Sequence, residues 1–343
     1  MKSITNTANV KQMNTALIKT VLKAMPGNTK ANIALATGLS HATCNTILNE
    51  LVTTGEVLEM EKENSNGGRP AQQYQFNGDY AHVICLYIDN ENRNPVIKYA
   101  LINLLGNILK EKSIKKDTVD YDTLEELIGE LLQDYQKVKT IGIGIPGVVL
   151  KHTVISFCDI KALVGCHLAE RLQSKFGVNV ILENDMNLTA LGFYQAQNYE
   201  EDTSIAVLTF IKDNLPGAGI IVDGHIVRGY SNFAGEVSFL PFDCTRKQQF
   251  QLLRTRDGVL NFTTKSLCSI IAVINPQTII LTGTLLSEDM LEEIICCCSN
   301  IIPKEHMPHI FLQETVHEYY IRGLLEMSLE SLTYPLKMIQ KRI

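Results

Sequence analysis

The 343-residue chain lacks the marks of a membrane, exported or metal-binding protein. No apolar run reaches the ~18 residues that span a bilayer, and the first residues, MKSITNTANVKQ, have neither the apolar core nor the cleavage site of an export signal. The nine cysteines form no Cys-x-x-Cys pair and no Cys/His spacing suited to a metal ion. We therefore expect a cytoplasmic protein with reduced, buried thiols, and we expect Cys296, Cys297 and Cys298 to lie within a helix.

Charge is moderate and unevenly distributed. The formal net charge is −6, yet residues 1–78 carry seven Lys and Arg against five Glu, while the rest carries 24 against 32 acidic residues. A mildly basic segment on an acidic chain favours an anionic partner for that segment. Hydrophobic residues make up 45% of the chain, which with this length indicates a globular protein of two or three domains.

Three helical segments with short breaks are predicted within the first 55 residues. The first, NTALIKTVLKAM, is amphipathic and has Leu17 on its apolar stripe. The second, KANIALAT, is expected to bury Ile33, Leu35 and Ala36 and to end at Gly38. The third, HATCNTILNELVTT, follows a short turn, and this spacing is typical of a helix-turn-helix.

The third helix presents a polar face that suits DNA. Short side chains that donate and accept hydrogen bonds can read base edges in a major groove, and a hydroxyl at the helix start can meet a phosphate. The candidate base-reading residues are His41, Thr43, Asn45, Thr46 and Asn49, and the candidate phosphate ligand is Ser40, the predicted N-cap. A solvated face on an ordinary three-helix bundle would explain the same pattern.

The segment behind the third helix favours the DNA-binding interpretation. EVLEMEKE and QQYQF are strand-like, and NSNGGRPA between them supplies two glycines and Arg69. This arrangement predicts a β-hairpin wing, whose arginine can enter a minor groove. We therefore expect a winged helix-turn-helix domain over residues 1–78.

From residue 79 onward, strands alternate with helices. HVICLYID, PVIKYALIN, KTIGIGIPGVV, VNVILEND, SIAVLTFI and NPQTIILTG read as strands, and TLEELIGELLQDY and MNLTALGFYQAQ read as helices. Such a succession over residues 79–343 predicts an α/β domain of two lobes with a cleft between them.

Four segments resemble the ROK family, which groups repressors, open reading frames and sugar kinases. They are IGIGIPGVV at 141–149, LENDMNLTALGFY at 182–194, GAGIIVDGHIVRGYSNFAGEVSF at 217–239 and INPQTIILTG at 274–283. The resemblance implies a two-lobed actin/hexokinase-like fold for the α/β part. The N-terminal winged helix with GGRP at 67–70 is similar to the repressor branch of that family.

The resemblance also implies a sugar site. It implies that Asn184, Asp185 and Glu236 bind sugar hydroxyls, and in kinase members the aspartate matching Asp185 is the general base. An amide and a carboxylate at a strand end are well placed for such a cleft. The alternatives are that Asn184 and Asp185 only cap the following helix and that Glu236 is an ordinary surface residue.

The chain departs from the family at the nucleotide loops. Asp89-Asn90-Glu91-Asn92 stands where kinase members have a glycine-rich phosphate turn, and Lys212–Pro216 replaces the second phosphate loop. The adenosine-side Gly-Gly has become Gly283-Thr284. These departures predict that ATP is not a cofactor and that the chain is not an enzyme.

The zinc site of the family is also missing from the sequence. Phe239 occupies the position of the family's histidine, and Cys244 is the single cysteine in the next stretch, FLPFDCTRKQQFQLLRTRDG. One thiol does not make a four-coordinate structural site, so no metal is expected. Because the same loop contributes to sugar binding in the family, its loss also bears on the inherited ligand.

These observations predict a transcriptional regulator that represses carbohydrate-use genes. Its expected partners are double-stranded operator DNA, a sugar or sugar-phosphate effector and further copies of itself in a homodimer or larger oligomer, with no membrane partner. Residues 1–78 would bind DNA, and residues 79–343 would sense the sugar and oligomerise. The alternatives are an ATP-dependent sugar kinase, and a regulator whose sensor domain binds a protein instead of a sugar.

Overall fold

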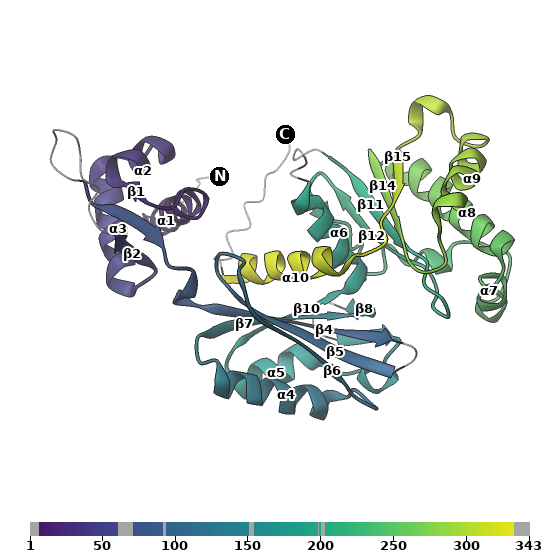
Figure 1. Cartoon of the computed structure of the whole chain (residues 1–343), viewed down its shortest axis with the longest axis horizontal. Coiled ribbons are helices and arrows are strands. Elements are labelled where there is room, and N and C mark those ends of the chain that lie inside the picture. The colour runs from purple at the N-terminus through teal and green to yellow at the C-terminus, as the bar shows by residue number, and fades with distance from the viewer. Residues whose placement is uncertain are drawn as a thin grey trace, which may run out of the picture.

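The computed structural model describes residues 7–60, 71–91, 94–150, 154–197, 199 and 203–332 (Figure 1). Its N-terminal unit consists of three helices and a small antiparallel sheet of strand order β1-β3-β2. The helices are α1 (Thr7–Ala24), α2 (Lys30–Thr37) and α3 (His41–Thr54), and the strands are β1 (Asn28–Thr29), β2 (Val57–Met60) and β3 (Gln73–Phe76). The unit has its own core, to which Ile18, Leu48 and Tyr74 contribute.

Local chemistry explains where α2 and α3 begin and end. The Thr29 hydroxyl accepts a hydrogen bond from the Asn32 amide, and the Ser40 hydroxyl accepts one from the Thr43 amide, so each helix has a side-chain N-cap. Gly38 follows α2 with φ 68°, a left-handed conformation that glycine adopts without a Cβ clash. The predicted break between the second and third helices is thus confirmed.

The predicted packing of the first two helices is partly wrong. Leu35 is 86% exposed and Ala36 is also exposed, whereas Ile33 and Ala34 are the buried residues of α2. This short helix touches its neighbours along one narrow stripe, and residues one and two positions beyond that stripe point away from it. Leu17 of α1 is exposed for the same reason.

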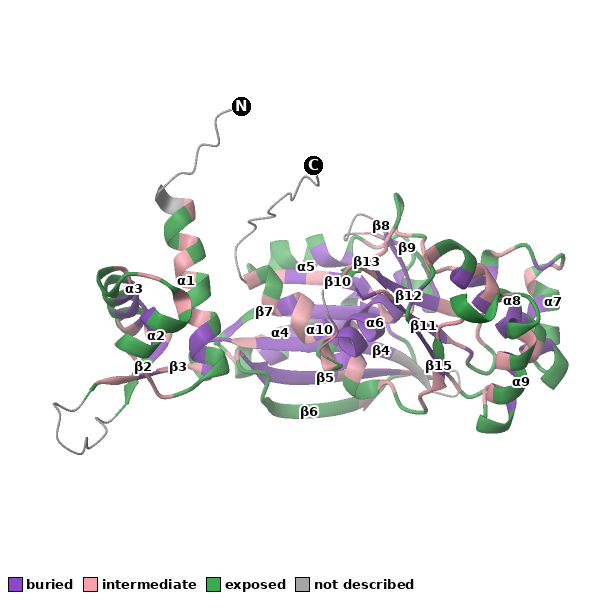
Figure 2. Ribbon diagram, turned by 90° about the horizontal axis from the view of Figure 1, so that it is seen from above, coloured by how far each residue is buried: buried purple, intermediate pink, exposed green. Residues whose placement is uncertain are grey.

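The first lobe is built on a five-stranded sheet of order β10-β7-β4-β5-β6. Its strands are β4 (His82–Glu91), β5 (Asn94–Asn103), β6 (Ile108–Lys115), β7 (Val138–Ile145) and β10 (Asn179–Asn184). Helices α4 (Tyr121–Asp134) and α5 (Leu168–Phe176) cover one face, and the hairpin of β8 (Gly147–Leu150) and β9 (Val154–Cys158) lies beside β10 (Figure 1). The edge strand β6 is exposed along most of its length (Figure 2).

The second lobe repeats this design with a sheet of order β13-β12-β11-β14-β15. Its strands are β11 (Ile205–Thr209), β12 (Gly217–Val222), β13 (His225–Ile226), β14 (Thr278–Thr282) and β15 (His309–Leu312). Helices α8 (Arg256–Ile274) and α9 (Glu288–Ser299) pack on its outer face, and α7 (Arg246–Leu252) precedes them. Among the described helices, α8 alone is long and apolar enough to cross a membrane, and half of that stretch is buried within the protein.

Helices α6 (Asp185–Ala196) and α10 (His317–Leu332) lie between the two sheets (Figure 1). They cross at Gly192 and Gly323. A Cβ on Gly192 would lie 1.8 Å from the Tyr319 carbonyl oxygen, and one on Gly323 would lie 1.9 Å from the Leu188 carbonyl oxygen. Because only hydrogen fits at both positions, the two helices pack backbone to backbone and bring the sheets together.

The cysteines match the prediction of buried thiols only in part, because four are buried, four are half-buried and Cys296 is exposed. All nine are free, and the run at 296–298 lies in α9. Cys298 is buried together with Met290 and Ile294, which share its helical stripe. Cys296 is exposed, because two residues of helix rotate it away from that stripe.

Candidate functional site

A cavity of about 250 Å³ opens between the two lobes. The first lobe contributes the end of β10 and the start of α6, with Asn184 and Asp185, and the second lobe contributes the start of β12 and Glu236. A larger adjoining cavity, of about 850 Å³, is lined by Lys161, Lys212 and Thr284, among others. The three residues proposed to bind a sugar therefore line one cavity, although they come from two lobes.

Both polar atoms of the Asn184 side chain form hydrogen bonds within the protein. Its side-chain oxygen accepts hydrogen bonds from the Met186 amide at 2.9 Å and the Asn187 amide at 3.1 Å, so it is the N-cap of α6. Its side-chain nitrogen donates to the Gly147 carbonyl at 2.9 Å. The capping alternative thus describes Asn184, while Asp185 is the first residue of the helix rather than its cap.

The two carboxyl groups proposed to bind the ligand have different surroundings. Asp185 accepts a hydrogen bond from the Met186 amide at 2.8 Å and is half-buried. Glu236 is also half-buried, and burial raises the pKa of its carboxyl group, which the Arg246 charge counteracts and the Asp159 charge reinforces.

A glycine allows the turn that carries Glu236 to approach the sheet. Gly235 has φ 95°, and a Cβ there would lie 2.0 Å from the carbonyl oxygen of Ala218 in β12. The Gly235 carbonyl accepts a hydrogen bond from the Ala218 amide at 2.8 Å. The glycine of this Ala-Gly-Glu sequence therefore lets the turn lie directly against β12, which places Glu236 at the cavity wall.

Sequence reasoning missed two charged residues of the cavity, Asp159 and Arg246. Asp159 follows β9, and burial by the cavity walls raises the pKa of its carboxyl group, while Arg246 lowers it. Arg246 is the first residue of α7, and its guanidinium lies 4.1 Å from the ring centroid of Phe239. Neither residue belongs to a recognisable motif, so no sequence signal could have placed them here.

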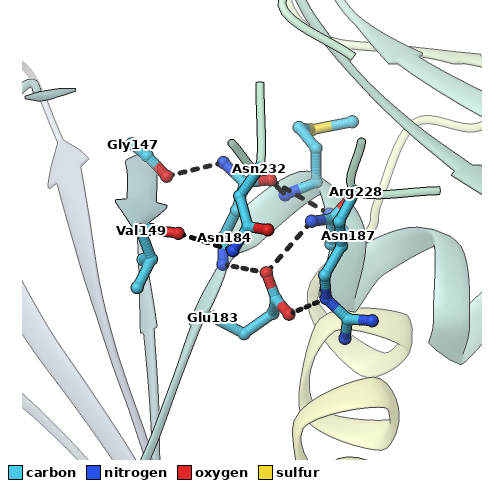
Figure 3. A network of polar contacts seen from close by, with 8 residues as sticks. Gly147, Val149, Glu183, Asn184, Asn187, Arg228 and Asn232 are labelled. Carbon is cyan, nitrogen blue, oxygen red and sulfur yellow. Dashed lines mark hydrogen bonds and ion pairs between the residues drawn. The ribbon is translucent and has the colours of Figure 1, made fainter. Parts of the chain in front are cut away.

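Behind the cavity lies a buried polar network centred on Glu183 (Figure 3). Its carboxylate is 1% exposed and accepts hydrogen bonds from Arg228 Nε at 2.8 Å, Asn187 Nδ2 at 3.0 Å and the Asn184 amide at 2.9 Å. Asn232, from the loop of Arg228, donates to the Val149 carbonyl at 2.6 Å (Figure 3). The loop after β13 thereby joins the second lobe to the first. The sequence did contain a signal for this network, namely the carboxylate of Glu183 within the apolar run VILEND.

The structure describes part of the two segments that stand where kinase members of the family have phosphate loops. β4 continues through Glu91, whose backbone pairs with Asn94 of β5, while Asn92 lies outside the described residues. In the second loop the Lys212 amide donates to the Thr284 hydroxyl at 3.0 Å, and Arg254 pairs with Asp213. Thr284, which replaces a family glycine, therefore uses a backbone donor on the wall of the larger cavity.

The described residues contain no group of three or more His, Cys, Asp or Glu side chains placed to hold a metal ion. Phe239, at the position of the family's histidine, is 50% exposed and packs on Phe233 with ring centroids 4.9 Å apart. Cys244 is a partly buried free thiol.

The candidate DNA-contacting residues of α3 lie mostly on its exposed face. His41, Asn45, Thr46 and Asn49 are exposed, and Asn45 accepts a hydrogen bond from Lys30 at 2.5 Å. This contact adds a cation from α2 that sequence reasoning did not single out.

The remaining candidate DNA contacts are Ser40, Thr43 and Arg69. Thr43 is half-buried, and its hydroxyl lies 2.8 Å from that of Ser40, whose oxygen also caps α3. Arg69 and the predicted tip of the wing lie outside the described residues, although β2 and β3, which flank that tip, pair antiparallel with Val57 opposite Phe76.

Comparisons with known proteins agree with this architecture. The profile of the ROK family matches residues 95–251. This chain contains a ROK domain. The xylose repressor of Bacillus subtilis is 28% identical to it over 247 residues, which make up 68% of this chain but 62% of that protein.

Two solved structures share the fold at low sequence identity. A ROK-family transcriptional regulator, a homologue of Escherichia coli MLC, aligns with a TM-score of 0.68 and 17% identity over 94% of this chain and 99% of its own. The ROK hexokinase of Thermus thermophilus aligns with a TM-score of 0.58 and 17% identity, covering 73% of this chain and 99% of its own. The hexokinase thus lacks a counterpart for about a quarter of this chain.

Proposed function

We propose that this protein is a DNA-binding transcriptional repressor of carbohydrate-use genes, controlled by a sugar or sugar derivative in its ROK domain. The observation that carries the proposal is the exposed polar face of α3, presented by a capped helix pair in front of a ROK domain. The regulator structure aligns over 94% of the chain and the hexokinase over 73%, which supports a regulator. The name of the xylose repressor supports a sugar effector.

In this proposal, residues 1–78 form a winged helix-turn-helix and residues 79–343 form the sensing and oligomerising part. The helices α2 and α3 and the β2–β3 pair have the order that such a domain requires. A homodimer in the cytoplasm would bind two half-sites of an operator, and an effector that favours one lobe arrangement would change their spacing.

We also propose that the ROK domain does not transfer phosphate. Kinases of this kind depend on backbone N–H groups that cradle phosphates, and here one such donor, that of Lys212, is bonded to Thr284. A coupled assay with ATP and a panel of hexoses and amino sugars should give no turnover. Turnover near ~1–100 s⁻¹ would establish the kinase alternative.

The DNA-binding proposal is tested with operators selected from random DNA. Replacing Asn45 or Arg69 by alanine should weaken operator binding by about 1–3 kcal/mol, because each would lose a groove or phosphate contact. The control is Lys265→Ala, which removes an exposed charge from α8 in the second lobe. Equal affinity of all three variants and the wild type would contradict the assignment of residues 1–78. Addition of sugars and sugar phosphates to the complex then identifies the effector.

A further inference from the structure

Arg246 is held in place by aromatic rings at the cavity. Its guanidinium lies 4.1 Å from the ring centroid of Phe239 and 5.7 Å from that of Phe157. A capping box at Thr245 fixes the backbone from which it extends, since Thr245 and Gln248 satisfy each other's amides. The side chain is therefore pre-organised before any ligand arrives.

The guanidinium keeps most of its hydrogen-bonding capacity. Within the described part of the chain, Arg246 forms no ion pair, and its one hydrogen bond is a long one of 3.4 Å to the Ser238 hydroxyl. A guanidinium offers five N–H donors in a planar fork. Several donors of Arg246 thus remain for a ligand in the cavity that this residue lines.

The charge of Arg246 acts on the acids around it. Burial raises the pKa values of Glu236 and Asp159, and in both cases Arg246 is the cation that lowers them. The cavity is also lined by the carboxyl groups of Asp185 and Asp213. Next to Asp159 in the chain is the Cys158 thiol, whose pKa burial raises to about 12. An ionised carboxylate accepts hydrogen bonds from sugar hydroxyls more strongly than a neutral acid does.

We infer that Arg246 is a ligand-positioning residue of this cleft: held against Phe239, it places its charge beside Glu236 and Asp159, and its remaining N–H groups donate to the ligand that these residues contact. The inference rests on the proposed sugar-sensing function. The stacking on Phe239 gives it further support. The position at which the ROK resemblance expects a histidine donor carries a phenyl ring, and a donor from α7 lies against that ring. The ligand class is a polyhydroxylated sugar that presents both donor and acceptor oxygens.

A titration without ligand tests the electrostatic half of the inference. Full-length protein labelled with ¹³C at the glutamate carboxyl carbon is titrated by NMR, and the Glu236 signal is assigned from its loss in Glu236→Gln. Arg246→Gln should raise the pKa of Glu236, Arg246→Lys should leave it close to the wild-type value, and Lys247→Gln, on the exposed neighbour, should not change it. An unchanged Glu236 pKa in Arg246→Gln would overturn the inference.

Calorimetric titration tests the ligand half with xylose, glucose, N-acetylglucosamine and glucose 6-phosphate as probes. Whichever probe the wild type binds should bind Arg246→Gln about 10- to 100-fold more weakly, because a charged hydrogen-bond partner is lost. The acidic limb of the pH profile of binding should move to higher pH, and Arg246→Lys should restore that limb.

The possible failures are distinguishable. If Arg246→Gln binds a probe with wild-type affinity and pH profile, the inference is wrong and the sugar-sensing proposal stands. If no probe binds the wild type while the Glu236 titration shifts as expected, the electrostatic role holds and sugar sensing fails. Melting curves of both Arg246 variants serve to exclude unfolding as the cause of lost binding.

Discussion

Two groups of charged residues lie close to the same cavity, yet they differ in how completely they are paired. Behind the cavity, the buried Glu183 carboxylate accepts three hydrogen bonds, from Arg228, Asn187 and the Asn184 amide. Within the cavity, the Arg246 side chain has one long hydrogen bond, and Glu236 and Asp159 have raised pKa values. The first group is saturated by the protein, whereas the second retains capacity for a ligand.

The difference indicates separate roles. A buried charge without partners is costly, so a saturated network holds elements together and gives nothing to a ligand. An open group at a cavity can exchange water for ligand hydroxyls with little change in the fold. Substitutions in the first group should therefore change stability, and substitutions in the second should change ligand response.

The largest effect is expected from Arg228→Met. It leaves the Glu183 carboxylate buried without its cation, and breaking such a pair costs about 3–5 kcal/mol of unfolding free energy. Chemical denaturation measures this loss. The control is Arg256→Met, since Arg256 pairs with Asp289 and Glu293 at the surface, and it should leave the unfolding free energy nearly unchanged. A double variant, Glu183→Met with Arg228→Met, should be less destabilised than Arg228→Met alone; a larger loss would argue against the buried pair.

Asn184→Ala should have the next largest effect. It removes the N-cap of α6 at a cost of about 0.5–2 kcal/mol, together with the hydrogen bond to the Gly147 carbonyl. Asn184→Asp keeps the capping oxygen and should recover part of the stability. If Asn184→Ala melts like the wild type but loses sugar binding, Asn184 belongs to the open group instead.

Asp185→Asn should affect stability less. It removes a negative charge from the first turn of α6, where the helix dipole makes it worth about 0.3–1 kcal/mol. Its larger consequence should be loss of the sugar's effect on operator affinity, measured by titrating the effector into the DNA complex. If the variant has a slightly lower melting temperature but its operator affinity still responds to sugar, Asp185 only stabilises the helix.

Glu236→Gln should have the smallest effect on stability, and that effect should depend on pH. The raised pKa of Glu236 means that the folded state binds its proton more tightly than the unfolded state. This contribution is fully present below the ordinary value of 4.5 and is lost as pH rises through the folded pKa. The variant should therefore match the wild type within about 0.5 kcal/mol near pH 4 and equal or exceed it at pH 7. If the stability of the variant relative to the wild type were lower at pH 7 than at pH 4, that result would contradict burial of this carboxyl group.

Much of the fold follows from patterns that are local in the chain. The helix caps at Ser40 and Gly38, the apolar runs of the strands and the helix after Asn184 were predicted because each depends on residues a few positions apart. The buried side of α2 was not predicted correctly, because the neighbouring elements decide which side of an eight-residue helix is covered. Part of the cavity lining was also predicted, namely Asn184, Asp185 and Glu236.

The sequence by itself determined the kinds of elements, their order and the motifs that border the cleft, because periodicity, capping and turn chemistry act over short distances. Only the tertiary structure decided what those residues do. It assigned the amide of Asn184 to a helix cap and to Gly147, and it brought Arg228 of the second lobe to Glu183 of the first. It also placed Arg246 against Phe239 in the cavity. Hydrogen-bond saturation and burial are sums over all neighbours in space, and Arg228 and Glu183, which are 45 positions apart, become neighbours only when the two lobes come together around α6 and α10.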